Sequence, residues 1–213
     1  TRFAQNAGFS GFSELKKSYF HTEVEKSEMM MDFNANEYDL LSENEETELL
    51  MSEFEQVAKD ISAYNNNLYI DTFKELCRTI HEAHQIQLFF VWIPGHISSM
   101  LQHILLTAGK YVNYYPNKYH QLLSVEQLRN DDLAIVISLE GSYVLGNREL
   151  MLKIKQSTAK TVLITNNPEM KLSSIFDEVI SLGDHGIERS GKYKLMMFVE
   201  MLAHQYFNLY AKN

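Results

Sequence analysis

The chain has 213 residues, a length that suits one compact domain with a small appendage. Hydrophobic residues make up 45% and charged residues 22%, and no apolar run approaches the length of a membrane span, so we expect no membrane partner. The net charge of -9 argues against the whole chain being a nucleic-acid binder. A single cysteine, Cys77, excludes an internal disulfide framework and favours a reducing cytoplasm.

The first residues predict two short helices joined by a turn that contains glycine. Residues 1–7 have the pattern of a helix end with Gly8 as its C-cap, and Ser13 can cap a second helix. Because the pattern begins in the middle of a helix, we expect the chain to be a fragment that continues upstream. A generic helical hairpin is the alternative interpretation of this stretch.

This N-terminal stretch resembles the tail of the helix-turn-helix domain in RpiR-type (MurR/RpiR) transcriptional regulators. The matching residues are the pair Arg2-Phe3, the turn Gly8-Phe9-Ser10-Gly11-Phe12 and the triplet Glu14-Leu15-Lys16. The resemblance implies that residues 1–26 are the C-terminal tail of a DNA-binding domain, in which Arg2 could contact DNA phosphates. It also implies that an SIS (sugar isomerase) domain follows directly.

Residues 27–45 hold many acidic residues and few periodic apolar positions, which is typical of a linker. Helical spacing returns over residues 46–65. Asp71 is expected to cap the next helix, which places Phe73, Leu76, Cys77 and Ile80 on one apolar face. At that position Cys77 is better explained as a buried structural thiol than as a nucleophile.

The remaining chain alternates apolar runs of strand length with helical patterns. The predicted strands are residues 86–93, 111–115, 133–137, 161–165 and 178–182. The predicted helices are residues 100–109 with Gly109 at the end, 124–129, 148–156, a short one at 172–176, and a long one at 193–210. In that last helix the inward residues are expected to be Leu195, Met196, Val199, Leu202, His204 and Phe207. This alternation predicts an α/β fold: a five-stranded parallel sheet of flavodoxin-like type, with helices on both faces.

Residues 131–167 form the centre of this prediction. A strand, the polar loop 138–142, a helix and a second strand make a βαβ unit, and ligands of such sheets bind at the carboxyl ends of strands. ISLEGSY and VLITNNP resemble the phosphosugar-binding core of SIS domains, in which Ser138, Gly141, Thr165 and Asn167 match the usual pattern. Glu140 stands where a serine is usual in the family, and Tyr143 where a threonine is usual.

The SIS resemblance implies that residues 46–213 are an effector-binding and dimerisation domain with its first and third strands side by side. The loops at 94–99 and 138–142 would then face each other, and the candidate ligand-binding residues are Gly95, His96, Ser98, Ser99, Ser138, Glu140, Gly141 and Ser142. Glycine and serine before a helix suit a phosphate, whereas the Glu140 carboxylate would repel one. His96 could contact a ligand or Glu140, or it is an ordinary loop histidine.

Together the two resemblances predict a transcriptional regulator of carbohydrate metabolism rather than an enzyme. It would bind operator DNA, sense a sugar phosphate or related carbohydrate derivative, and form a homodimer. A sugar-phosphate isomerase with Glu140 and His96 as its acid and base is one alternative. A regulator whose SIS domain binds no ligand and only dimerises is another. His81 and His84 lie three apart with no third ligand near in sequence, so we expect no metal and no cofactor.

Overall fold

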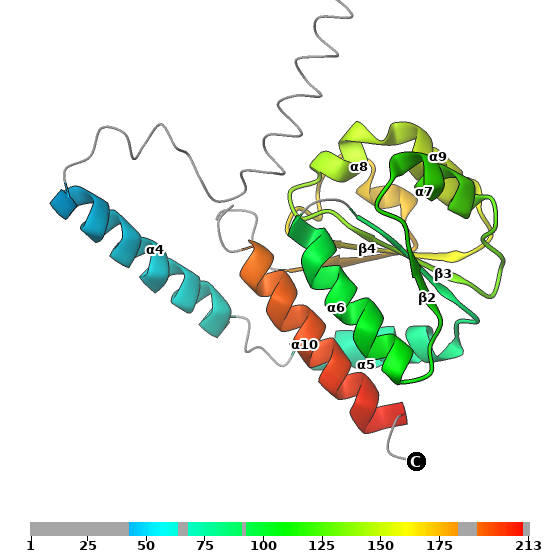
Figure 1. Cartoon of the computed structure of the whole chain (residues 1–213), viewed down its shortest axis with the longest axis horizontal. Helices are drawn as coiled ribbons and strands as arrows, with labels where there is room; N and C mark the ends of the chain where they lie inside the picture. Colours follow the sequence, from blue (N-terminus) through cyan, green and yellow to red (C-terminus); the bar gives the residue numbers. More distant parts are fainter. Residues whose placement is uncertain (1–42, 64–67, 91–92, 183–190, 211–213) are drawn as a thin grey trace, which may run out of the picture.

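The computed structural model describes residues 43–63, 68–90, 93–182 and 191–210. A long helix, α4 (Glu43–Ala63), precedes the sheet domain and lies to one side of it, towards the C-terminal helix (Figure 1). This helix overlaps the one predicted at 46–65 over residues 46–63 and begins three residues earlier. The residues that resemble a helix-turn-helix tail, including Arg2, lie outside the described part of the chain.

Five parallel strands form the sheet, as predicted. They are β1 (Ile86–Phe89), β2 (Val112–Tyr114), β3 (Leu133–Ile137), β4 (Lys160–Thr165) and β5 (Glu178–Ser181). Their order is β2-β1-β3-β4-β5, so β1 and β3 are neighbours, in a register that pairs Phe89 with Val136. The chain runs outward in opposite directions from these two strands, and this switch point is where open α/β sheets bind ligands.

Seven further helical segments are described around the sheet. They are α5 (Leu68–Glu82), α6 (Ile93–Thr107), α7 (Lys118–Val125), α8 (Ser142–Gly146), α9 (Arg148–Gln156), a 3-10 turn (Ser173–Ile175) and α10 (Gly191–Tyr210). Figure 1 shows α5, α6 and α10 on one face of the sheet and α7, α8 and α9 on the other. The prediction of helices on both faces is therefore confirmed.

The central strand β3 is buried on both faces, which explains why its sequence is apolar without interruption. All five of its residues are buried, and they alternate between two hydrophobic cores. Leu133, Ile135 and Ile137 belong to the core under α5, α6 and α10, whereas Ala134 and Val136 belong to the core under α7 to α9. A strand covered on both faces has no solvent-facing position that would select a polar residue.

The apolar face predicted for α5 is confirmed, and it carries the buried cysteine. Cys77 is fully buried between α5 and α10, and its thiol lies 3.7 Å from the Leu202 carbonyl oxygen. Burial raises the pKa of the Cys77 thiol to about 12, because the charged thiolate is poorly solvated there. The thiol therefore stays protonated near neutral pH, as a structural residue does.

Several predicted boundaries of helices and strands are wrong. Asp71 lies inside the first turn of α5 rather than at its cap. The helix expected at 124–129 is α7, which begins earlier because the Asn117 side chain accepts a hydrogen bond from the Tyr119 N–H at 2.8 Å and caps it. The strand expected at 86–93 ends at Phe89, and α6 already begins at Ile93.

The inward face predicted for the last helix is only partly right. Leu195, Val199 and Leu202 are buried on α10, whereas Met196, His204 and Phe207 are exposed. Exposed apolar residues thus remain on the outer side of this helix.

Candidate functional site

The candidate site residues from the first predicted loop lie on the first two turns of α6. Pro94 fits there, because a residue in the first turn of a helix needs no intrahelical partner for its N–H. Ser98 is buried, while His96 and Ser99 are exposed. The Ser99 hydroxyl donates to the His96 carbonyl oxygen at 2.7 Å, so it is used within the helix.

Gly95 has a packing role. A Cβ atom at this position would lie 3.3 Å from the Phe90 ring and 3.7 Å from the Tyr114 hydroxyl, so the glycine lets α6 approach these two aromatic side chains closely. Their rings stack with centroids 4.0 Å apart. The structure therefore explains Gly95 without a ligand.

The second loop follows β3, as the sequence predicted, and it turns sharply at Gly141. Gly141 has a φ of 92°, a conformation that residues with a Cβ rarely adopt. A Cβ there would also lie only 2.7 Å from the Met170 sulfur. This turn directs the chain into α8, which begins at Ser142.

Three buried polar atoms at the carboxyl edge of the sheet have no hydrogen-bond partner within the described residues. They are Ser98 Oγ, Ser138 Oγ and Asn166 Oδ1. Ser98 follows β1 along the chain, Ser138 directly follows β3, and Asn166 directly follows β4. Native proteins rarely leave such groups unpaired, because each costs about 1–3 kcal/mol when it is cut off from water.

Glu140 contacts the residue that follows β4. Its Oε1 atom accepts a hydrogen bond from Asn166 Nδ2 at 3.1 Å. Gly191, the first residue of α10, packs against both side chains: a Cβ there would lie 2.3 Å from Asn166 Nδ2 and 3.6 Å from Glu140 Oε1. No hydrogen bond or ion pair joins Glu140 to His96 in the described part of the chain. We name Ser98, Ser138, Glu140 and Asn166 the switch-point cluster.

Tyr143 points away from this cluster. Its hydroxyl donates to Gln121 Oε1 at 2.6 Å, and the Gln121 amide donates to the carbonyl oxygens of Phe90 and Tyr115, at 3.1 and 2.7 Å. Both side chains are buried. This network ties α8 to α7 and to the segments that follow β1 and β2, so Tyr143 stabilises the loop instead of offering a hydroxyl to a ligand.

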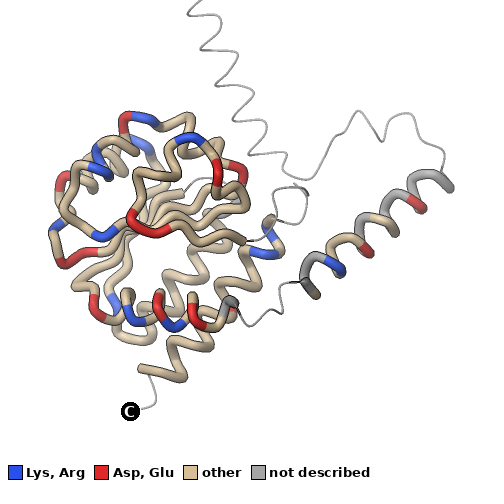
Figure 2. Tube along the Cα trace, turned by 180° about the vertical axis from the view of Figure 1, so that it is seen from behind, with Lys and Arg blue, Asp and Glu red and all other residues tan. Residues whose placement is uncertain are grey.

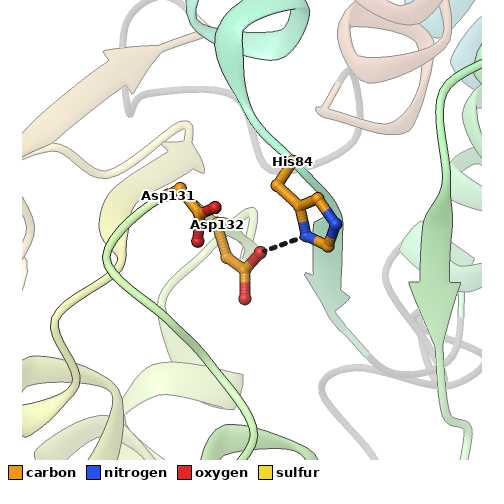
Figure 3. Close-up of side chains that lie close together, drawn as sticks. All are labelled: His84, Asp131 and Asp132. Carbon is orange, nitrogen blue, oxygen red and sulfur yellow. Dashed lines mark hydrogen bonds and ion pairs between the residues drawn. The ribbon is translucent and has the colours of Figure 1, made fainter.

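A second polar cluster lies at the opposite, amino edge of the sheet (Figure 3). Potential ligand atoms of His84, Asp131 and Asp132 lie within 4.8 Å of one another. However, Asp132 Oδ2 accepts hydrogen bonds from Gln85 Nε2 and the Arg129 N–H, both at 2.9 Å, and its Oδ1 lies 3.4 Å from His84 Nδ1. Because both carboxylate oxygens of Asp132 already have partners in the chain, we interpret this cluster as a structural contact that links the starts of β1 and β3.

Comparison with known proteins places the fold. No protein-family model matches the chain. The sequence is 27% identical over 165 residues to an uncharacterised helix-turn-helix-type transcriptional regulator of Providencia stuartii, a match that covers 76% of this chain and 56% of the relative. The chain thus spans about half the length of that regulator.

Three solved structures are similar in fold. Vibrio vulnificus NanR complexed with ManNAc-6P superposes with a TM-score of 0.65 and 14% identity, over 99% of this chain and 74% of NanR. The sugar isomerase domain of an RpiR transcription factor from Sphaerobacter thermophilus has a TM-score of 0.61 and 14% identity, and the match covers 78% of this chain and 91% of that domain's chain. Methanococcus jannaschii MJ1247 has an inferred function of 3-hexulose-6-phosphate isomerase. Its TM-score is 0.61 and its identity 18%, and the match covers 74% of this chain and 90% of MJ1247.

The sheet domain has the SIS fold. The predicted resemblance to RpiR-type regulators is confirmed as well, because the sequence relative is a helix-turn-helix-type regulator and one matching SIS domain comes from an RpiR transcription factor. The adjacency of the first and third strands, which this resemblance implied, is present in the sheet.

Sequence reasoning missed Asn166 and Gly191, two residues that lie beside Glu140 at the candidate site. Asn166 lies in the turn after β4, between Thr165 and Asn167, which were recognised. Gly191 lies just before the helix predicted at 193–210, and its role is visible only from its proximity to Asn166. A glycine at the start of a long apolar helix was the only sequence signal for that contact.

Proposed function

We propose that this chain is part of a transcriptional regulator of carbohydrate metabolism, and that its SIS domain binds a sugar phosphate or related carbohydrate derivative as effector. The regulator relative and the NanR complex with ManNAc-6P support this proposal. In this view the protein is a sensor rather than an enzyme.

The unpaired hydroxyls of Ser98 and Ser138 carry the proposal. Both side chains are buried at the switch point, and neither has a partner among the described residues. A serine hydroxyl can donate or accept, so it suits the hydroxyl, amine or phosphate groups of a sugar derivative. Hydrogen bonds to a ligand would recover the cost that these atoms carry without one.

Calorimetric titration of the wild type and Ser138→Ala with sugar phosphates and amino sugars tests this proposal. We expect the substitution to weaken binding about tenfold, the equivalent of one hydrogen bond. Ser157→Ala is a matched control, because Ser157 Oγ donates to the Ile154 carbonyl at 2.7 Å, at the end of α9. Equal binding by all three proteins would remove Ser138 from the site, and no binding by the wild type would favour a domain that only dimerises.

In this proposal the helix-turn-helix domain, and not the SIS domain, binds DNA. The residues that read DNA lie in the N-terminal part of a recognition helix. The resemblance of this chain covers only the end of such a helix, at Arg2-Phe3, and the turn after it. In the described region, Figure 2 shows Lys and Arg interspersed with Asp and Glu around the sheet domain rather than gathered in a stripe. We therefore expect a gel-shift assay of this chain with operator DNA to show no complex. Sequence-specific binding would contradict this assignment.

We also propose a homodimer that pairs through helices. Exposed apolar residues lie on α4 and on the outer side of α10, among them Met51, Phe54, Met196 and Phe207. Burying such residues against a second copy would remove apolar surface from water. Light scattering should give twice the chain mass of 24.8 kDa, whereas a monomer would contradict the proposal.

An isomerase is the second candidate, and the fold similarity to MJ1247 favours it. The Glu140 carboxylate is the candidate base, but it accepts a hydrogen bond from Asn166, and His96 lies exposed on α6 without a described hydrogen bond to it. Isomerisation needs an acid and a base that reach the same substrate. Turnover of a sugar phosphate that is lost in Glu140→Gln would establish this alternative.

A further inference from the structure

The switch-point cluster offers acceptors in a place where a phosphate site needs donors. Asn166 uses its amide nitrogen to donate to Glu140 Oε1, which leaves its amide oxygen, Oδ1, buried and without a partner within the described residues. An amide oxygen and a carboxylate can only accept hydrogen bonds, unless the acid is protonated. A ligand group at this position must therefore donate.

The start of α10 explains why the carboxylate can be held here. Gly191 lies against Asn166 and Glu140, so the first turn of this 20-residue helix faces them. Unpaired N–H groups and the helix dipole make a helix N-terminus favourable for negative charge. Glu140 supplies that charge from within the chain, so no external anion is needed at the helix end.

The same carboxylate disfavours a phosphate next to it. A phosphate monoester carries between one and two negative charges at neutral pH, and like charges repel more strongly where water is partly excluded. The two serine hydroxyls do not decide the matter, because they can act as donors or acceptors.

We propose that Glu140 and Asn166 determine the ligand class: they bind the unphosphorylated, donor-bearing face of a sugar, an amino group best of all, and exclude a phosphate group from this position. The inference rests on the proposed function, since it assumes that the SIS domain binds a carbohydrate. It adds the chemical class of the ligand and names the two residues that select it.

Titration of the full chain with glucosamine and glucosamine 6-phosphate tests the proposal directly. The wild type should bind glucosamine at least tenfold more tightly than its 6-phosphate. Glu140→Gln keeps the shape of the side chain but removes its charge, so this preference should shrink at least tenfold or reverse. Glu140→Ser provides a second, smaller variant, and thermal melting by circular dichroism verifies that each variant is folded.

Glu149→Gln is the matched control, because it removes an exposed carboxylate from the first turn of α9. It should leave the preference unchanged, and an equal effect of Glu149→Gln would overturn the assignment to Glu140. If the wild type prefers the 6-phosphate and Glu140→Gln has no effect, the inference is overturned while the proposed function stands. If neither sugar binds to the wild type or to either Glu140 variant, the inference and the proposed carbohydrate sensor are both overturned.

Discussion

The two edges of the sheet bury polar side chains to a similar degree but treat them differently. At the amino edge the Asp132 side chain is buried and both of its oxygens are engaged by groups of the chain itself. At the carboxyl edge the hydroxyls of Ser98 and Ser138 are just as buried but have no partner in the described structure. The polar groups of the first edge are satisfied by the chain itself, whereas the second edge keeps these two hydroxyls unsatisfied.

This difference separates stability from function. Buried polar groups that are satisfied hold the fold together, whereas unsatisfied ones carry a cost that a ligand can recover. The metal-like geometry of His84, Asp131 and Asp132 is therefore weaker support for a site than the two lone serine hydroxyls. The predictions below test this division by removing groups from each edge.

Asp132→Ala should have the largest effect on folding. Removing the carboxylate leaves the Gln85 amide and the Arg129 N–H without their acceptor, and we expect the free energy of unfolding to fall by about 3 kcal/mol. Urea denaturation followed by circular dichroism measures this loss. Asp131→Ala is the control, since that exposed side chain should change stability by less than about 0.5 kcal/mol. Similar values for the two variants would break the comparison.

Gln121→Leu should have the next largest effect, although Gln121 acts beside the carboxyl edge. The change removes the acceptor of the Tyr143 hydroxyl and the donor to the carbonyl oxygens of Phe90 and Tyr115, so we expect the free energy of unfolding to fall by about 2 kcal/mol. Urea denaturation followed by circular dichroism measures this loss as well. Tyr143→Phe removes only one of these bonds and should cost about 1 kcal/mol. A neutral Gln121→Leu would mean that the network contributes nothing to stability.

Ser138→Ala should have the smallest effect on the protein without ligand. The hydroxyl makes no described hydrogen bond, so its removal should change the free energy of unfolding by less than about 0.5 kcal/mol, or should stabilise the fold. Thermal melting of the free protein checks this. A loss comparable to that of Asp132→Ala would show that the hydroxyl has a structural partner, and the contrast between the edges would disappear.

Much of the fold could be predicted from the sequence, because strands buried on both faces leave continuous apolar runs. β3 and α9 begin and end where the pattern placed them. The start of α6 was missed, because Pro94 and Gly95 favour a loop by composition, although the first turn of a helix tolerates them. The start of α7 was missed because the Asn117 cap was not recognised.

The site was less predictable than the fold, for a different physical reason. Ser138 and Glu140 follow a strand that the pattern locates well, so their place at the carboxyl edge could be inferred. Which group Glu140 contacts could not be inferred, because Asn166 and Gly191 are 26 and 51 residues away along the chain. Such choices depend on how segments pack, and they leave no periodic trace in the sequence.

The short outer strands of the sheet have a consequence for aggregation. β2 and β5 stand at the two edges, and they have only three and four residues. An exposed edge strand can recruit strands of other molecules, and shortness and charge are the usual safeguards. β5 adds Glu178, whose carboxylate lies 3.8 Å from the Lys160 ammonium on its neighbour. Copies of this domain are thus poorly suited to open-ended polymerisation through their sheets, which leaves the helical surfaces for association.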